Sequence, residues 1–245
     1  MQMSVKSFLV VASLALSVLI GVVLGRHGAD AGPGVESRPV RIGLSLDTLK
    51  EARWTRDRDA FVEQARSLGA EVTVLSANSD DNRQVADVES LVTAQMDVIV
   101  IVPHDGRAMA RGVEIAHRAG IPVISYDRLI LDSEPDLYMT FDNERVGQLQ
   151  AEYILDALRE SRRPIRLVRI YGSRTDNNAA LFKAGQDKGL QAAINAGRVI
   201  VLHEDWADDW KPENAKRIMN AAITRHGRDI DAVLASNDGT AGGAI

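Results

Sequence analysis

The chain has 245 residues, 45% hydrophobic and 26% charged, which is the composition of a globular protein with enough material for one large domain or two small ones. Its net charge is −5 and no basic stripe is visible, so the sequence argues against nucleic acid as a partner. It contains no cysteine, which excludes disulfides, Cys-based zinc sites, thiol catalysis and a lipid-modified N-terminal cysteine.

The first residues have the pattern of a secretory leader. Lys6 precedes an apolar run over residues 8–24, and Ala29-Asp30-Ala31 forms a small-x-small cleavage site. The pattern predicts a signal peptide over residues 1–31 and a Gly/Pro-containing linker over residues 32–37. A retained membrane anchor is the alternative, because the apolar run approaches the shortest length of a spanning helix. Under both interpretations the folded part lies outside the cytoplasm.

From residue 38 on, short apolar runs alternate with longer amphipathic stretches, and this alternation predicts an α/β fold with parallel sheets. In the first half, we expect strands over residues 40–46, 71–76, 97–102, 123–127 and 137–141, and helices over residues 53–68, 82–94 and 107–119. Gly69 and Gly120 follow two of these helices, where a residue that tolerates positive φ ends a helix. The apolar face of the first helix, predicted to pack on the sheet, consists of Trp54, Phe61, Ala65 and Leu68.

The same alternation restarts in the second half. The predicted elements are a helix over residues 144–158, a strand over 165–171, a helix over 178–196, a strand over 198–202, a helix entered through Pro212, and a strand over 231–236. They predict two Rossmann-like, doubly wound lobes, an N-terminal one over residues 38–142 and a C-terminal one over residues 143–245. Because three strands would leave an apolar sheet face uncovered, we expect the second lobe to be incomplete, truncated at the C-terminus.

The loops after the strands carry side chains suited to a sugar. The strand over residues 123–127 ends in Asp127, which can accept hydrogen bonds from hydroxyls, and Arg128, which presents its donors in a fixed fork. Sugars combine hydroxyls with apolar C–H faces, so their sites need flat aromatic rings as well as amides, carboxylates and guanidinium groups. The candidate ligand-binding residues are Arg53, Trp54, Asp127, Arg128, Asn178, Trp210 and Asn237.

Most of the candidates also have a structural interpretation. Trp54 could be a core residue of its helix, whereas Trp210 follows an acidic loop where a core role is hard to explain. Asn178 and Asn237 could cap helices. Asp127 and Arg128 could form a structural ion pair with each other.

Enzymatic function is less well supported. The sequence has no G-x-G-x-x-G, Walker A or G-x-S-x-G pattern, and its five histidines lack metal-ligand spacing. We therefore predict no catalytic residue, no metal and no cofactor. A glycosidase that uses Asp127 and Asp142 as its carboxylate pair stays a remote alternative, because that chemistry depends on a separation that sequence does not give.

Several motifs occur in an order that resembles a known family. They are Arg41-Ile42-Gly43-Leu44-Ser45-Leu46, Arg53-Trp54 followed by Asp57-Arg58-Asp59, Ser125-Tyr126-Asp127-Arg128, Phe141-Asp142-Asn143-Glu144, Asp176-Asn177-Asn178, Asp209-Trp210-Lys211-Pro212-Glu213-Asn214 and Ser236-Asn237-Asp238. Together they resemble the D-xylose-binding proteins of bacterial ABC sugar importers, which are related to ribose- and galactose-binding proteins. The resemblance implies the periplasmic binding protein type I fold, with two lobes joined by a hinge that close on one monosaccharide.

The resemblance also implies roles and partners. Trp54 and Trp210 would stack on opposite faces of the sugar ring, and the other five candidates would bind its hydroxyls. The protein would be a periplasmic monomer, would deliver D-xylose or a close monosaccharide to an inner-membrane ABC permease, and could also contact a chemoreceptor. Family members continue beyond residue 245 with further sugar contacts. The rival is a sugar-sensing effector core related to transcriptional repressors, which the leader disfavours because such proteins begin with a helix-turn-helix.

Overall fold

The structure is a computed structural model that describes residues 38–245. The predicted signal peptide and linker lie outside the described residues. The chain from Val40 to Ile245 packs as one unit built on two sheets. Within this described part, no helix has both the length and the apolar character needed to cross a membrane.

The first sheet is parallel throughout, with the strand order β2-β1-β3-β4-β5. Its strands are β1 (Arg41–Leu46), β2 (Glu71–Ser76), β3 (Val98–Val102), β4 (Val123–Tyr126) and β5 (Leu137–Met139). The connecting helices are α2 (Ala52–Ser67), α3 (Asp81–Thr93) and α4 (Ala110–Arg118). The buried strands β1 and β3 are rich in branched aliphatic residues, as expected where both faces of a parallel sheet are covered.

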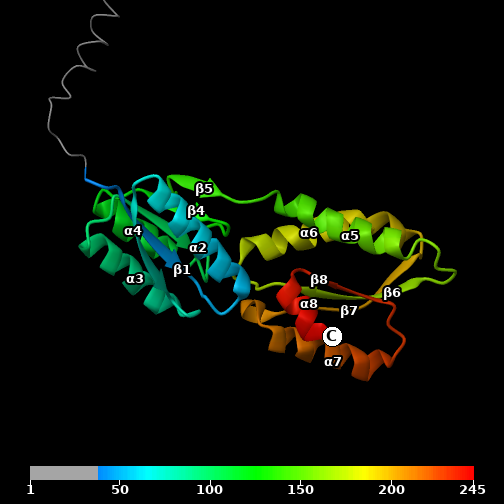
Figure 1. The fold of residues 1–245 in the computed structure, drawn as a ribbon. Coiled ribbons are helices and arrows are strands. Elements are labelled where there is room, and N and C mark those ends of the chain that lie inside the picture. The colour runs from blue at the N-terminus through cyan, green and yellow to red at the C-terminus, as the bar shows by residue number, and fades with distance from the viewer. Residues whose placement is uncertain (1–37) are drawn as a thin grey trace, which may run out of the picture. The chain divides into compact units, whose positions relative to one another are not determined.

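Helices cover both faces of the first sheet (Figure 1). Val88 of α3 and Val113 of α4 pack against Ile99 and Ile101 of β3 on one face. On the other face, Trp54 of α2 packs among the remaining apolar side chains of the sheet. The alternation of strand side chains between the two faces thus divides this half into two apolar cores.

The second sheet is also parallel, with the order β7-β6-β8. Its elements are α5 (Asn143–Ala157), β6 (Ile165–Tyr171), α6 (Asn177–Asn195), β7 (Val199–Trp206), the single turn η1 (Asp208–Trp210), α7 (Pro212–His226), β8 (Ala232–Ala235) and α8 (Asp238–Ala244). Helices α5 and α6 cover one face, and α7 and α8 cover the other (Figure 1).

The predicted α/β class with parallel sheets is confirmed, and most element boundaries agree within two residues. Gly69 and Gly120 have φ of +79° and +73°, as their positions after helices predicted. The strand predicted over residues 198–202 is longer and ends at Trp206, because polar residues of β7 continue to pair with β6. The placement of Leu68 on the apolar face of α2 is wrong, since this residue is the C-cap and its side chain is 76% exposed.

Helices α5 and α6 approach so closely that glycine is required at their contact. A methyl group at Gly185 would overlap the backbone carbonyl of Glu144, and one at Gly147 would overlap that of Phe182. Backbone atoms cannot move aside as a flexible side chain can, so the contact fixes how the two helices pack.

We predict that Gly185→Ala lowers the free energy of unfolding by about 1–3 kcal/mol, because the added methyl forces the two helices apart. Chemical denaturation followed by circular dichroism measures this. Gly242→Ala is the matched control, since Gly242 lies in α8 with open space around it. Equal stability of the two variants would contradict the proposed contact.

Candidate functional site

A cleft of about 1150 Å³ lies at the carboxyl ends of the strands of both sheets. This is the end of a parallel sheet at which α/β proteins bind ligands, because the loops there carry polar groups. All seven residues predicted from the sequence contribute to its lining: Arg53, Trp54, Asp127, Arg128, Asn178, Trp210 and Asn237.

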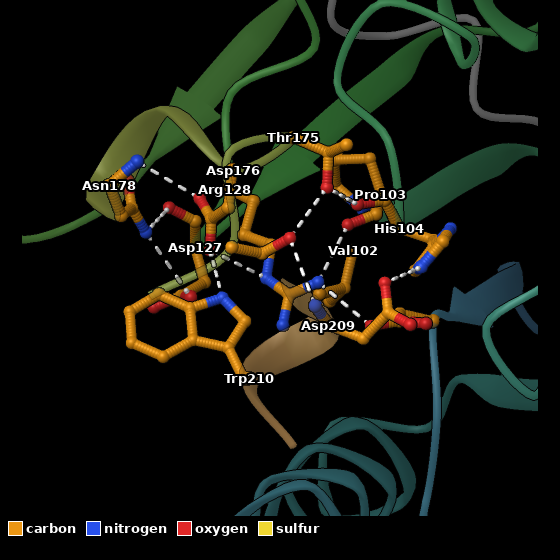
Figure 2. Close-up of polar contacts among 12 residues, drawn as sticks. Val102, Pro103, His104, Asp127, Arg128, Thr175, Asp176, Asn178, Asp209 and Trp210 are labelled. Atoms are coloured by element: carbon orange, nitrogen blue, oxygen red, sulfur yellow. Dashed lines mark hydrogen bonds and ion pairs between the residues drawn. The ribbon is translucent and has the colours of Figure 1, made fainter. Parts of the chain in front are cut away.

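Arg128 is the buried centre of the polar network (Figure 2). Its Nη1 lies 2.8 Å from Asp47 Oδ2, and its Nε lies 3.0 Å from Asp176 Oδ2. Nη1 also donates to the Pro103 carbonyl at 3.0 Å. Burial alone would lower the pKa of Arg128, but the two carboxylates outweigh it and the net shift is upward. Within the described residues these contacts use Nη1 and Nε.

The suggested ion pair between Asp127 and Arg128 is therefore wrong, because each residue has another partner. Asp127 Oδ1 accepts from Arg53 Nη2 at 2.7 Å. The backbone of Asp127 has φ of +63°, which turns the chain sharply after β4 and sends the two neighbouring side chains to different partners.

Asn178 fixes the position of Asp127 from the second sheet. Its Nδ2 donates to the Asp127 carbonyl at 3.0 Å, and its Oδ1 accepts from Asn143 Nδ2 at 2.9 Å. Asn178 does not cap α6, because Asp176 occupies the N-cap position and its side chain accepts from the Asn178 backbone. For Asn237 the capping interpretation is correct: its Oδ1 accepts from the Thr240 backbone at 2.8 Å at the start of α8, and the residue also lines the cleft.

Trp54 is both a core residue and part of the cleft wall. Its side chain is 2% exposed and packs against β1 and β3. The Arg53 guanidinium lies 4.4 Å from the centroid of the indole, and that of Arg128 lies 5.3 Å from it. Two cations thus occupy positions over the ring, which is a favourable contact with its π-electrons.

Trp210 is only 6% exposed, although the acidic loop before it gave no reason to expect burial. Its Nε1 donates to Asp176 Oδ2 at 3.1 Å, and its ring meets Phe182 edge to face at a centroid distance of 6.3 Å. The six-membered ring lies directly against the backbone of Gly172, where any side chain would overlap it. The indole is therefore held in one orientation at the cleft.

Asp176 is a site residue that was not among the seven candidates, although it begins the motif Asp176-Asn177-Asn178. One carboxylate pairs with Arg128, receives the Trp210 indole N–H and caps α6. Burial raises the pKa of Asp176, although Arg128 opposes that shift. The sequence shows that it lies after β6, in the loop before α6. Its partners could not be predicted, because they lie in loops that are far from it in the sequence.

Charge in the cleft is nearly balanced. The cations that line it are Lys50, Arg53, Arg56, Arg128 and Lys211, and the acids are Glu51, Asp127, Asp176, Asp209, Glu213 and Asp238. No group of His, Cys, Asp or Glu within residues 38–245 has the geometry of a metal site. A cleft with paired charges and two indoles favours a neutral polyol over a phosphate or a metal complex.

Asp142, the second carboxylate of the glycosidase alternative, serves the fold instead. It caps α5 by accepting from the Arg145 backbone at 3.0 Å and does not contribute to the cleft lining.

Comparison with known families identifies the fold. Residues 42–245 match the model of the periplasmic binding protein domain. The chain belongs to this family. The type I fold that the resemblance implied is confirmed.

Relatives of known function are sugar-binding proteins. The chain is 44% identical over 209 residues to the D-xylose-binding periplasmic protein of Escherichia coli (strain K12), an alignment that covers 85% of this chain and 62% of that protein. It is 32% identical over 246 residues to the multiple sugar-binding periplasmic receptor ChvE of Rhizobium radiobacter, covering 96% of this chain and 68% of that protein. These relatives are binding proteins and not enzymes, as the sequence led us to expect.

Solved structures agree with the family assignment. An ABC transporter solute binding protein from Clostridium phytofermentans, solved with bound β-D-glucose, has a TM-score of 0.77 and 31% identity to this chain. The comparison covers 83% of this chain and 67% of that one.

We predict that Gly172→Ala displaces the Trp210 indole and lowers the free energy of unfolding by about 1–3 kcal/mol, because the new methyl occupies the place of the ring. Near-ultraviolet circular dichroism reports the orientation of the indole, and denaturation reports the stability. Gly239→Ala is the control, since its nearest neighbour would lie at an ordinary 3.6 Å. An unchanged aromatic spectrum for Gly172→Ala would contradict this packing.

Proposed function

We propose that the protein is a periplasmic solute-binding protein that holds D-xylose, or a close monosaccharide, in this cleft and delivers it to an ABC permease of the inner membrane. The observation that carries the proposal is the convergence of all seven predicted residues on one cleft of balanced charge. The relatives support a monosaccharide as the ligand, since the protein of Escherichia coli at 44% identity is a D-xylose-binding protein.

The polar side chains would bind the sugar hydroxyls. Asp127 and Asn178 are already fixed by partners inside the protein, so they would meet the ligand without losing much conformational freedom. Arg128 would offer Nη2, and Asn237 would contribute its side-chain amide at the start of α8.

The two indoles would enclose the apolar faces of the ring. Arg53 lies over Trp54, and its side chain is 49% exposed, so the guanidinium has room to shift along the ring while it stays paired with Asp127 at 2.7 Å. We infer that the sugar takes the place of this guanidinium on Trp54, while Arg53 moves to the edge of the ring and binds hydroxyls. Binding would then exchange a cation–π contact for a stacked ring.

The two sheets would act as separate lobes, residues 38–142 and 143–245, which close on the ligand. A monomer would suffice for this function, with the permease as its main partner and a chemoreceptor as a further one. We infer no chemical step and no cofactor. The chain spans 62% of the length of the Escherichia coli protein that it matches.

Isothermal titration calorimetry with D-xylose, D-ribose, L-arabinose and D-glucose tests the proposal. We predict saturable binding of one sugar per chain, with D-xylose bound most tightly. The absence of binding to all four sugars would contradict the proposed function.

We further predict that Trp210→Ala weakens D-xylose binding by about tenfold or more, because the ring loses one stacking surface and the site opens to water. Trp206→Ala is the matched control: this indole packs against Tyr171 at a centroid distance of 4.9 Å and is not part of the cleft lining. An equal loss of affinity in both variants would mean that Trp210→Ala acts by disturbing the fold and not by removing a contact with the sugar.

A further inference from the structure

His104 connects elements of the two sheets through its imidazole ring (Figure 2). The residue follows β3, and its side chain is 13% exposed. Nδ1 lies 2.8 Å from Asp81 Oδ1 in the first turn of α3, and Nε2 lies 3.2 Å from Asp209 Oδ1 in η1. The ring therefore bridges the first sheet and the turn that carries Trp210.

The backbone of His104 is fixed on both sides of this bridge. Its N–H donates to Gln84 Oε1 at 2.9 Å, and its carbonyl accepts from Thr175 Oγ1 at 3.3 Å. Gly106 N–H donates to the Thr175 carbonyl at 3.2 Å. The ring is thus held where it meets η1, so the bridge is a property of the local fold.

The turn η1 needs such an anchor. Asp209 and Trp210 have φ of +56° and +58°, in the left-handed region that costs free energy for residues other than glycine. Three contacts hold Asp209 there: Oδ1 meets His104, Oδ2 meets Lys211 Nζ at 2.7 Å, and its N–H donates to Ser173 Oγ at 3.2 Å. Of these, the one to His104 crosses to the first sheet.

The surroundings of His104 favour its charged form. Both ring nitrogens face carboxylates, and only the imidazolium can donate from both. Asp47, which is itself paired with Arg128, also lies near the His104 ring, and Lys211 pairs with the other carboxylate oxygen of Asp209. Burial lowers the pKa of His104, but the hydrogen bonds to Asp81 and Asp209 and the charge of Asp47 give a net rise. The pKa of Asp209 is lowered, since burial is outweighed by Lys211 and His104, so this carboxylate stays ionised in mild acid.

We propose that His104 is a positioning residue: in its protonated form it ties the turn that carries Trp210 to the first sheet, and so makes ligand affinity dependent on pH. This inference rests on the proposed function, because it assumes that the ligand lies between the two sides of the cleft. A ligand enclosed from both sides binds best when the two sides are held together. A bond between the two sides therefore raises the affinity for the ligand, and the bound ligand in turn stabilises that bond.

The direction of the pH dependence follows from linkage. The pKa of His104 is raised while the bridge is formed, so protonation of the ring stabilises the bridged arrangement. This stabilisation is complete at pH values below the pKa that His104 has without the bridge. As the pH rises through the raised pKa, one ring nitrogen loses its proton and presents a lone pair to a carboxylate. The bridge then weakens, and affinity for the sugar falls.

Calorimetric titration of D-xylose between pH 5.5 and 8.5 tests this inference. We expect the dissociation constant of the natural protein to rise about fivefold across this range, a modest coupling between two sites. His104→Gln should give a nearly flat profile, because an amide does not titrate. His117→Gln should keep the natural slope, since His117 Nε2 pairs with Asp136 at 2.9 Å between elements of the first sheet alone. A flat profile in the natural protein, or a natural slope in His104→Gln, would overturn the inference.

Nuclear magnetic resonance titration of the histidine ring protons, without sugar, separates this inference from the proposed function. His104 should titrate above its ordinary pKa, and Asp209→Asn should lower that pKa. If Asp209→Asn does not fold, Asp81→Asn removes the other carboxylate and should act in the same direction. If His104 has an ordinary pKa that neither variant changes, the proposed bridge is wrong, whether or not the protein binds a sugar. A raised pKa in a protein that binds none of the sugars contradicts the proposed function instead.

Discussion

The buried guanidinium of Arg128 joins the two halves of the structure. It pairs with Asp47 after β1 and with Asp176 after β6, so one cation connects the carboxyl ends of both sheets. Removing one member of a buried ion pair leaves an uncompensated charge and costs about 3–5 kcal/mol, more than a surface pair contributes. Asp176 then carries the connection to the Trp210 indole and to α6, so the aromatic wall of the cleft depends on the same cation.

This arrangement also explains why the cleft suits an uncharged ligand. Three of the six acids that line it are committed to internal partners: Asp127 to Arg53, Asp176 to Arg128, and Asp209 to Lys211 and His104. Sugar hydroxyls can donate to and accept from groups that are already paired, and the indoles provide surface for the C–H faces.

Much of this could be predicted from the sequence. The strand over residues 123–127 and the loops after the other strands located the site, because parallel strands bring their carboxyl ends to one edge. The partner of each charge could not be predicted: adjacency suggested that Arg128 pairs with Asp127, whereas the left-handed backbone of Asp127 separates them. Burial of Trp210 was equally hidden, because it depends on Gly172 and Asp176, which lie more than thirty positions earlier in the sequence.

The account as a whole depends on where the sugar lies. A crystal structure of the protein grown with saturating D-xylose tests this most directly. We expect density for one pyranose between the indoles of Trp54 and Trp210, with its hydroxyls within hydrogen-bond distance of Asp127, Asn178 and Arg128, and with Arg53 moved off the Trp54 ring. Density for the sugar outside this cleft, or an Arg53 that keeps its place on Trp54 while the sugar is bound elsewhere, would contradict the account.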